Sequence, residues 1–285
     1  MTKKQILIEA INNGINDKNE LLKLTGYTKG SLASAMTLYI NKPKSVNIIA
    51  IAKQQITTAH KVTFSINKRF SFMEKAVKMV VKGVQNSLFI AGDGGLGKTY
   101  TVTKKMEELD ANYKMIAGYA TASGLYRALH DNPESLIVFD DCDSVLEDKN
   151  AINILKAATD TKEKRIVSYN AKMKDYKTSF EFKGQIIFIS NLTIDKLPQA
   201  LQSRSTVIDL AMSVNDKIDR IESVLPNINE ATLEMRKLAL EFIKKNADRI
   251  SDINFRTLIK VAKIFVECED DMEEAKEMAL FLVQG

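Results

Sequence analysis

The stretch Gly92-Asp93-Gly94-Gly95-Leu96-Gly97-Lys98-Thr99 decides the fold of this chain. It fits the pattern G-x-x-x-x-G-K-[ST] of a phosphate-binding loop, and it follows an apolar run at 88–91 that we predict to be a strand. Its glycines allow the backbone to wrap around a polyphosphate, and the Lys98 ammonium would reach the outer phosphates. Apolar residues then recur at helical spacing: Val102, Met106 and Leu109. We therefore predict a strand, loop and helix that bind a nucleotide, with Mg²⁺ held by Thr99; a glycine turn that matches by chance is the alternative.

The composition is that of an ordinary globular protein of 285 residues, with 45% hydrophobic and 27% charged residues. Lysine and arginine outnumber aspartate and glutamate by 41 to 36, and the net charge of +5 mildly favours polyanionic partners. Cys142 and Cys268 lack metal-ligand spacing, and no apolar run is long enough to span a membrane. We expect a cytoplasmic protein without a membrane partner, whose metal is the Mg²⁺ that accompanies the nucleotide.

The first forty residues predict a small all-α domain, 1–45, with helices at 6–13, 18–25 and 28–40. The third helix has one apolar stripe: Leu32, Ala35, Met36, Tyr39 and Ile40. This arrangement resembles a helix-turn-helix, whose second helix would enter a DNA major groove. A module that binds protein or merely packs is the alternative. The stretch 41–45 contains Pro43 and is the predicted linker, with a domain boundary between 41 and 66.

Strand and helix patterns alternate after the linker, as in a parallel sheet with crossover helices. The predicted strands lie at 88–91, 113–117, 135–139, 186–190 and 206–210, which gives an α/β domain, 46–211, with a five-stranded parallel sheet. Asp140 and Asp141 follow the third strand, at the edge where such sheets bind ligands. Asp140 would accompany Mg²⁺, and Asp141 would be the base or orienting group for the attacking water. Alternatively, both residues cap the next helix.

These residues resemble the AAA+ ATPases over about 60–285, with 92–99 as Walker A and 136–141 as Walker B. The family usually has Glu where this chain has Asp141. The resemblance implies a polar sensor at Asn191, after the fourth strand, although an Asn in a turn is also plausible. It also implies that ATP is the nucleotide; the residues themselves leave the base open. The expected nucleotide contacts are Gly92, Asp93, Gly94, Gly95, Leu96, Gly97, Lys98, Thr99, Tyr100 and Arg256.

The resemblance also implies an assembly. Arg204, just before the fifth strand, matches the arginine finger, which would enter the site of a neighbouring subunit in a homo-oligomer such as a hexamer. The alternative is a surface arginine. The helical patterns at 214–224, 231–243, 255–266 and 272–282 resemble the family's helical lid, 212–285. Arg256, at the start of the third lid helix, would meet the nucleotide of its own subunit.

The segment 165–182 predicts a β-hairpin with a polar tip at 170–177. Phe180 and Phe182 share one face and would pack inward. The tip carries three lysines expected to bind nucleic acid, Lys172, Lys174 and Lys177, and Tyr176 could stack on a base. Its position resembles the pore hairpin of AAA+ helicases. A solvated lysine-rich turn is the alternative.

The architecture resembles AAA+ factors of phage or plasmid replication. With the features above, this resemblance implies an oligomeric, Mg²⁺-dependent ATPase that acts on DNA, single-stranded in the pore, as a helicase, helicase loader or related replication motor. A replication protein is a candidate partner. A second hypothesis is a nucleotide-switched binding module with slow hydrolysis, which Asp141 favours. A third is a protein remodeller, which the lysine-rich hairpin disfavours.

Overall fold

A computed structural model describes residues 2–13, 15, 17–39, 64–118, 120–170 and 176–284. The chain divides into two compact units, Met1–Thr63 and Phe64–Gly285. The predicted linker at 41–45 and the predicted boundary at 45/46 lie outside the described residues.

Up to residue 39, the described part of the first unit contains helices α1 (Lys3–Asn12), α2 (Lys18–Thr25) and α3 (Lys29–Tyr39), as the apolar pattern predicts. Helix α1 begins earlier than predicted because Thr2 and Gln5 form a capping box there. Asp17 caps α2 through the amides of Asn19 and Glu20. The small core of this unit is formed by Leu7, Ala10, Leu21, Leu32 and Ala35.

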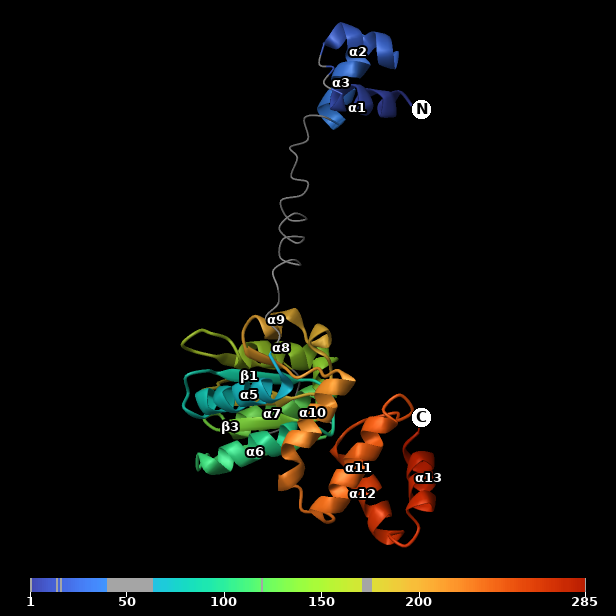
Figure 1. The fold of residues 1–285 in the computed structure, drawn as a ribbon. Coiled ribbons are helices and arrows are strands. Elements are labelled where there is room, and N and C mark those ends of the chain that lie inside the picture. The colour runs from blue at the N-terminus through green and yellow to red at the C-terminus, as the bar shows by residue number, and fades with distance from the viewer. Residues whose placement is uncertain are drawn as a thin grey trace. The chain divides into compact units, whose positions relative to one another are not determined.

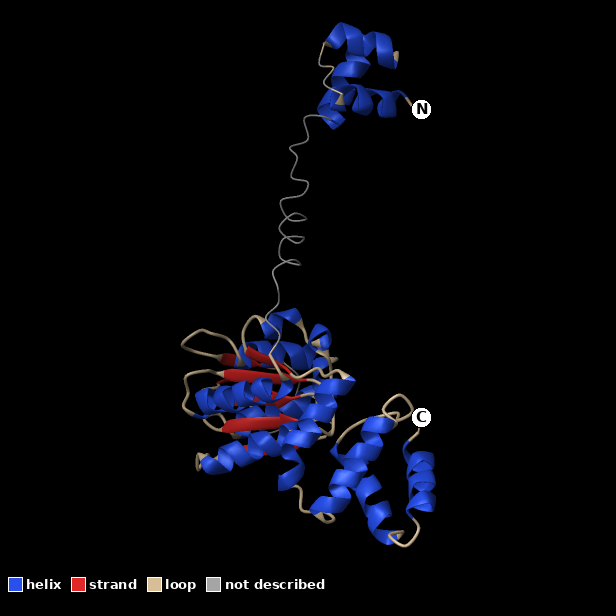
Figure 2. Cartoon of the chain, viewed as in Figure 1, coloured by secondary structure: helices blue, strands red, loops and turns tan. Residues whose placement is uncertain are grey.

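The second unit is built on a five-stranded parallel sheet, which confirms the predicted α/β class (Figure 2). Its strands are β1 (Ser87–Ala91), β2 (Tyr113–Ala117), β3 (Leu136–Asp140), β6 (Gln185–Ile189) and β7 (Thr206–Asp209). They lie in the order β2-β3-β6-β1-β7. Strand β1 is buried along its whole length, as expected for an interior strand covered on both faces.

Helices cover both faces of the sheet (Figure 1). Helices α5 (Ile66–Val81) and α6 (Lys98–Glu108) share one core with the inward residues of that face, among them Phe70 and Met73. Helices α7 (Ala122–Asp131) and α8 (Lys149–Ala158) share the other core, which contains Phe89, Phe139 and Phe188. Shorter helical turns complete this layer: η1 (Asp143–Leu146), η2 (Ile194–Lys196) and α9 (Gln199–Gln202).

The predicted hairpin is present, as the antiparallel strands β4 (Ile166–Ser168) and β5 (Ser179–Glu181). Phe182 is buried and Phe180 packs against the same core, as predicted. The tip residues 171–175, and with them Lys172 and Lys174, lie outside the described residues.

The chain ends in a helical bundle with its own core, which includes Leu240, Ile243, Val261 and Phe265. The helices are α10 (Val214–Val224), η3 (Leu225–Asn227), α11 (Leu233–Lys245), α12 (Phe255–Glu267) and α13 (Met272–Val283). Pro226 lies in η3 and separates α10 from α11, as predicted. We call this bundle the lid. In the part of the chain that the structure describes, no helix is long and apolar enough to cross a membrane.

Candidate active site

The candidate site lies where β1, β3 and β6 end, at the carboxyl edge of the sheet. Strand β6 pairs with both β1 and β3, so the segments that follow these three strands emerge side by side. Residues 92–97 follow β1, Asp140 and Asp141 stand at the end of β3, and Asn191 follows β6. The sheet order therefore brings together residues that are up to a hundred positions apart in sequence.

The phosphate-binding loop has the backbone conformation that its glycines allow. Gly92, Gly95 and Gly97 have φ values of 140°, 71° and 88°. A Cβ on Gly92 would lie 2.5 Å from the carbonyl carbon of Leu210. Helix α6 begins at Lys98, directly after Gly97, so its free N-terminal amides face the loop.

The Lys98 side chain points back into the loop and is only 5% exposed. Its Nζ donates to the carbonyl oxygens of Gly92 and Asp93, each at 2.7 Å, and to Asn191 Oδ1 at 2.8 Å. Burial lowers the pKa of Lys98, and nearby carboxylates oppose this shift: Asp141, Asp93, Asp140 and Asp143. The ammonium is thus held among oxygen atoms at the carboxyl edge of the sheet.

Thr99 and Asp140 form a pair across two elements. Thr99 Oγ1 donates to Asp140 Oδ1 at 3.0 Å, which joins the start of α6 to the end of β3. Burial raises the pKa of Asp140, while the Thr99 hydrogen bond lowers it. A hydroxyl and a carboxylate at this separation are hard oxygen donors of the kind that Mg²⁺ prefers, so these residues fit the predicted metal.

Asp141 and Asn191 form a second pair. Asn191 Nδ2 donates to Asp141 Oδ1 at 2.6 Å. Asp141 has a φ of 54°, in the left-handed region, which a non-glycine residue adopts at a cost in energy. The exposed carboxylate is therefore held in an unusual conformation beside the loop, which is common at functional sites.

Asp143, which was not predicted from the sequence, supports this pair through the backbone of Asn191. Its Oδ2 accepts the backbone N–H of Asn191 at 3.2 Å, and its Oδ1 is buried with no hydrogen-bond partner among the described residues. The run Asp140-Asp141-Cys142-Asp143 carried the signal, a third carboxylate close to Walker B.

The lid also contacts the phosphate-binding loop. The backbone N–H of Phe255, at the start of α12, donates to the Gly95 carbonyl at 3.1 Å. Arg256 lines a cavity of about 320 Å³ together with Lys98, Thr99, Asp141 and Asn191. The structure thus brings the predicted lid arginine to the predicted loop.

A larger cavity of about 660 Å³ adjoins the first and shares Gly97, Tyr100 and Phe255 with it. It lies between α5, α6 and the lid. Arg220 stacks on Phe70 with 3.6 Å between its guanidinium carbon and the ring centroid, and burial lowers its pKa to about 10. Tyr100 was predicted from the sequence as a nucleotide contact. Arg220 was not predicted, because the burial of Arg220 depends on how the lid packs.

Two predicted groups lie elsewhere. Arg204 is absent from the linings of both cavities, and its Nη1 donates to Ala200 O at 2.8 Å. Lys177 is exposed at the base of the hairpin tip, where its carbonyl accepts the Tyr126 hydroxyl at 2.8 Å. Tyr176 donates its hydroxyl to Asp131 at 3.0 Å and lies against His130, so its ring already has neighbours on α7.

The chain is similar in sequence to a known protein and similar in fold to several solved structures. No protein-family model matches it. A protein of Enterobacteria phage T4, described as an uncharacterized 36.7 kDa protein in the nrdC-mobD intergenic region, is 34% identical over 238 residues, which cover 73% of this chain and 72% of that protein. Similar solved structures include the Holliday junction branch migration motor RuvB of Thermotoga maritima, with a TM-score of 0.45 and 18% identity over 76% of this chain and 68% of that one. They also include the Aeropyrum pernix ORC1 protein in complex with DNA, with a TM-score of 0.43 and 12% identity over 76% of this chain and 65% of that one.

The fold assignment rests on the chain's own geometry: the phosphate-binding loop after β1, the carboxylates after β3, the polar residue after β6 and the strand order. The chain belongs to the family of this phage T4 protein, and it has the fold of the AAA+ P-loop ATPases.

Proposed function

We propose that the protein is a Mg²⁺-dependent ATPase that assembles into a homo-oligomer and couples hydrolysis to work on DNA, as a helicase, helicase loader or related replication motor. One observation carries the ATPase proposal. A single cavity of about 320 Å³ is lined by the loop, Lys98, Thr99, Asp141, Asn191 and Arg256. These are the charges and donors that phosphoryl transfer to water requires.

The loop and Lys98 would bind the phosphates. The ammonium has three protons, and it now donates to three protein oxygens. Phosphate oxygens would replace some of these acceptors, since charge-assisted hydrogen bonds to phosphate are stronger than those to carbonyls. Thr99 and Asp140 would hold Mg²⁺, whose charge would stabilise the negative charge on the phosphates.

Asp141 and Asn191 would act on the attacking water. Asn191 fixes one oxygen of the Asp141 carboxylate at 2.6 Å, which leaves the other oxygen to orient a water molecule and accept its proton. Because Asn191 also contacts Lys98, one side chain would align the groups that act on the outer phosphate and on the water. Arg256 would add positive charge from the lid, and Arg204 from a neighbouring subunit.

The larger cavity offers a place for the base and sugar of the nucleotide. It adjoins the phosphate cavity at Gly97 and Phe255, and its lining includes three polar residues, Asn67, Asn227 and Asn229. A binding series with ATP, GTP, CTP and UTP tests the assignment of ATP.

The DNA-binding part of the proposal is supported by the lysines expected at the hairpin tip and by the helix-turn-helix pattern of the first unit. The hairpin's base is anchored to α7, because Tyr126 bonds Lys177 and packs against Tyr169 and Phe180. A hairpin anchored in this way would follow movements of α7.

The test is ATPase activity measured across protein concentration, with and without single-stranded DNA. We expect stimulation by DNA, a specific activity that rises with concentration, and loss of stimulation when Lys172, Lys174 and Lys177 are replaced by Ala. Lys98→Ala is the inactive control. Strand separation of a forked duplex distinguishes a helicase from a loader. A specific ATPase activity that changes neither with single-stranded DNA nor with protein concentration would contradict the proposal of an oligomeric motor.

A nucleotide-switched binding module is the second candidate, and the identity of residue 141 favours it. The side chain of Asp141 is one methylene shorter than that of Glu, so its carboxylate would reach less far toward a water molecule. Slow turnover together with nucleotide-dependent assembly would support this candidate.

A further inference from the structure

Asp93 places a carboxylate in a loop that is otherwise suited to anions. Its side chain is 34% exposed, and its charge is close enough to raise the pKa of Lys98. A carboxylate at this place repels a polyphosphate unless another charge compensates it. The structure supplies such a charge.

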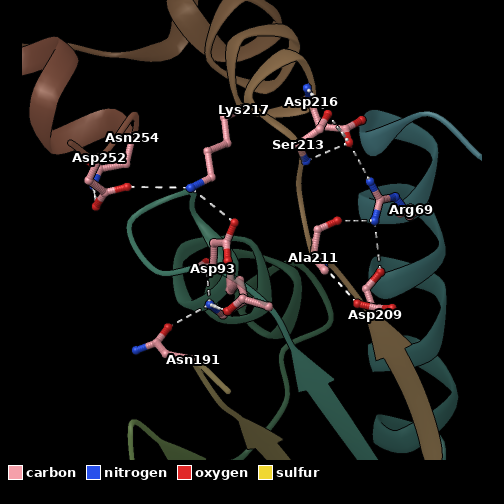
Figure 3. Close-up of polar contacts among 12 residues, drawn as sticks. Arg69, Asp93, Asn191, Asp209, Ala211, Ser213, Asp216, Lys217, Asp252 and Asn254 are labelled. Carbon is pink, nitrogen blue, oxygen red and sulfur yellow. Dashed lines mark hydrogen bonds and ion pairs between the residues drawn. The ribbon is translucent and has the colours of Figure 1, made fainter. Parts of the chain in front are cut away.

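Lys217, on the first lid helix α10, reaches across to the loop (Figure 3). Its Nζ lies 3.2 Å from Asp93 Oδ2 and 3.6 Å from Asp252 Oδ1, and its side chain is 19% exposed. Asp252 belongs to the segment between α11 and α12. One ammonium therefore joins the phosphate-binding loop to two separate parts of the lid.

Asp252, the second partner of Lys217, is linked through the start of α12 to the phosphate-binding loop. Asp252 Oδ2 accepts the Asn254 amide at 2.6 Å, and Asn254 caps α12 by accepting the Thr257 N–H at 3.0 Å. The next residue, Phe255, donates its backbone N–H to Gly95 O. The Lys217 bridge and the start of α12 thus hold the lid against the loop at two points.

The start of α10 is itself fixed, so Lys217 is directed at Asp93. Arg69 of α5 donates to the Ala211 carbonyl at 2.6 Å and forms an ion pair with Asp216 at 3.4 Å. Asp216 also forms a capping box with Ser213 at the first turn of α10. Lys217 is the next residue along this anchored turn, as Figure 3 shows.

We propose that Lys217 is a positioning residue with two effects: it neutralises Asp93 beside the phosphates, and it latches the lid onto the loop. The first effect rests on the proposed nucleotide-binding function, whereas the second is a property of the fold alone. Two readouts therefore test the inference, and only one of them requires a nucleotide.

The first readout is hydrogen exchange in the nucleotide-free protein. We expect Lys217→Met to speed the exchange of the peptide that contains the Phe255 amide, because the latch no longer holds that amide against Gly95. The matched control is Lys244→Met, which removes a 3.1 Å ion pair with Glu222 that lies within the lid and involves no residue of the loop. Lys217→Arg should keep the protection. If this peptide exchanges at the same rate in Lys217→Met and Lys244→Met, Lys217 does not hold the lid against the loop. This conclusion does not depend on what the protein binds.

The second readout is the Kd for N-methylanthraniloyl-ATP. We expect Lys217→Met to weaken binding about fivefold, the factor that corresponds to about 1 kcal/mol for a partly exposed ion pair. The double variant Asp93→Asn/Lys217→Met separates the two effects, because it removes the repulsion without restoring the latch. Its affinity should return toward that of the unaltered protein, while its exchange stays fast.

Two outcomes overturn the proposal at this stage. An unchanged Kd in Lys217→Met would exclude charge neutralisation, and so would a double variant that binds as weakly as Lys217→Met. If the unaltered protein itself binds no nucleotide, the proposed function fails, and the exchange experiment still decides the latch.

Discussion

Asn191 donates its side-chain amide to the Asp141 carboxylate at 2.6 Å, although 50 positions separate the two residues. The contact follows from the pairing of β3 with β6, in which Asp140 lies opposite Ile189. Residues directly after these neighbouring strands must therefore emerge together. The same Asn191 accepts a hydrogen bond from Lys98, so one amide side chain contacts both the carboxylate and the ammonium.

We expect Asn191→Ala to lower kcat about 10²-fold with little change in KM, since in the proposed ATPase the amide would orient groups that act in the transition state. Steady-state kinetics check this. Lys98→Ala should instead abolish nucleotide binding. A raised KM with an unchanged kcat in Asn191→Ala would show that Asn191 serves binding alone.

We expect Arg204→Ala and Lys98→Ala subunits, each inactive alone, to regain part of the ATPase activity when mixed. A mixed assembly contains sites with an intact loop from one chain and an intact Arg204 from the next. Each variant kept by itself at the same total concentration is the control. No recovery, in mixtures shown to co-assemble, would place Arg204 outside the neighbouring site.

We expect Asp140→Asn to stabilise the nucleotide-free protein at neutral pH while it removes Mg²⁺-dependent hydrolysis. Burial raises the pKa of Asp140, so the stability linked to its protonated form is fully present below the unfolded pKa of about 3.9 and is lost as pH rises through the folded pKa. The melting temperature of Asp140→Asn should therefore exceed that of the unaltered protein by a margin that grows from pH 4 to pH 7. A constant difference over this range would contradict the assigned cause.

We expect maleimide to label Cys268 but not Cys142 in the folded protein at pH 8. Cys142 is fully buried, and burial raises the pKa of its thiol to about 11, which leaves about 0.1% thiolate. Mass spectrometry locates the label, and both cysteines should react in denaturant. Rapid labelling of Cys142 would mean that the end of β3 opens readily.

We expect Gly184→Ala to destabilise the second unit by about 1–3 kcal/mol, as overpacking does. A Cβ there would lie 2.0 Å from the carbonyl oxygen of Ser135. Gly124→Ala is the matched control in the same unit, because its added Cβ would lie 3.4 Å from Thr121 Oγ1, an ordinary contact, and alanine favours the helix α7. Denaturant unfolding measures both. Equal stability of the two variants would show that the backbone at Gly184 shifts at little cost.

The sequence determined the features that depend on neighbours along the chain. A buried strand, a glycine loop and the helix after it are local patterns, because backbone freedom and side-chain periodicity act over a few residues. The same holds for the carboxylates after β3 and the break at Pro226. Alternating strands and helices then gave a parallel sheet, since parallel strands need crossover connections.

The tertiary structure alone decided which of these local features meet. The hydrogen bond of Asn191 with Lys98 and the support from Asp143 arise from strand order and register. The Lys217–Asp93 contact and the burial of Arg220 arise from how the lid packs on the loop. These contacts join residues tens to more than a hundred positions apart, and their partners are chosen by the packing of whole elements, which no local pattern encodes.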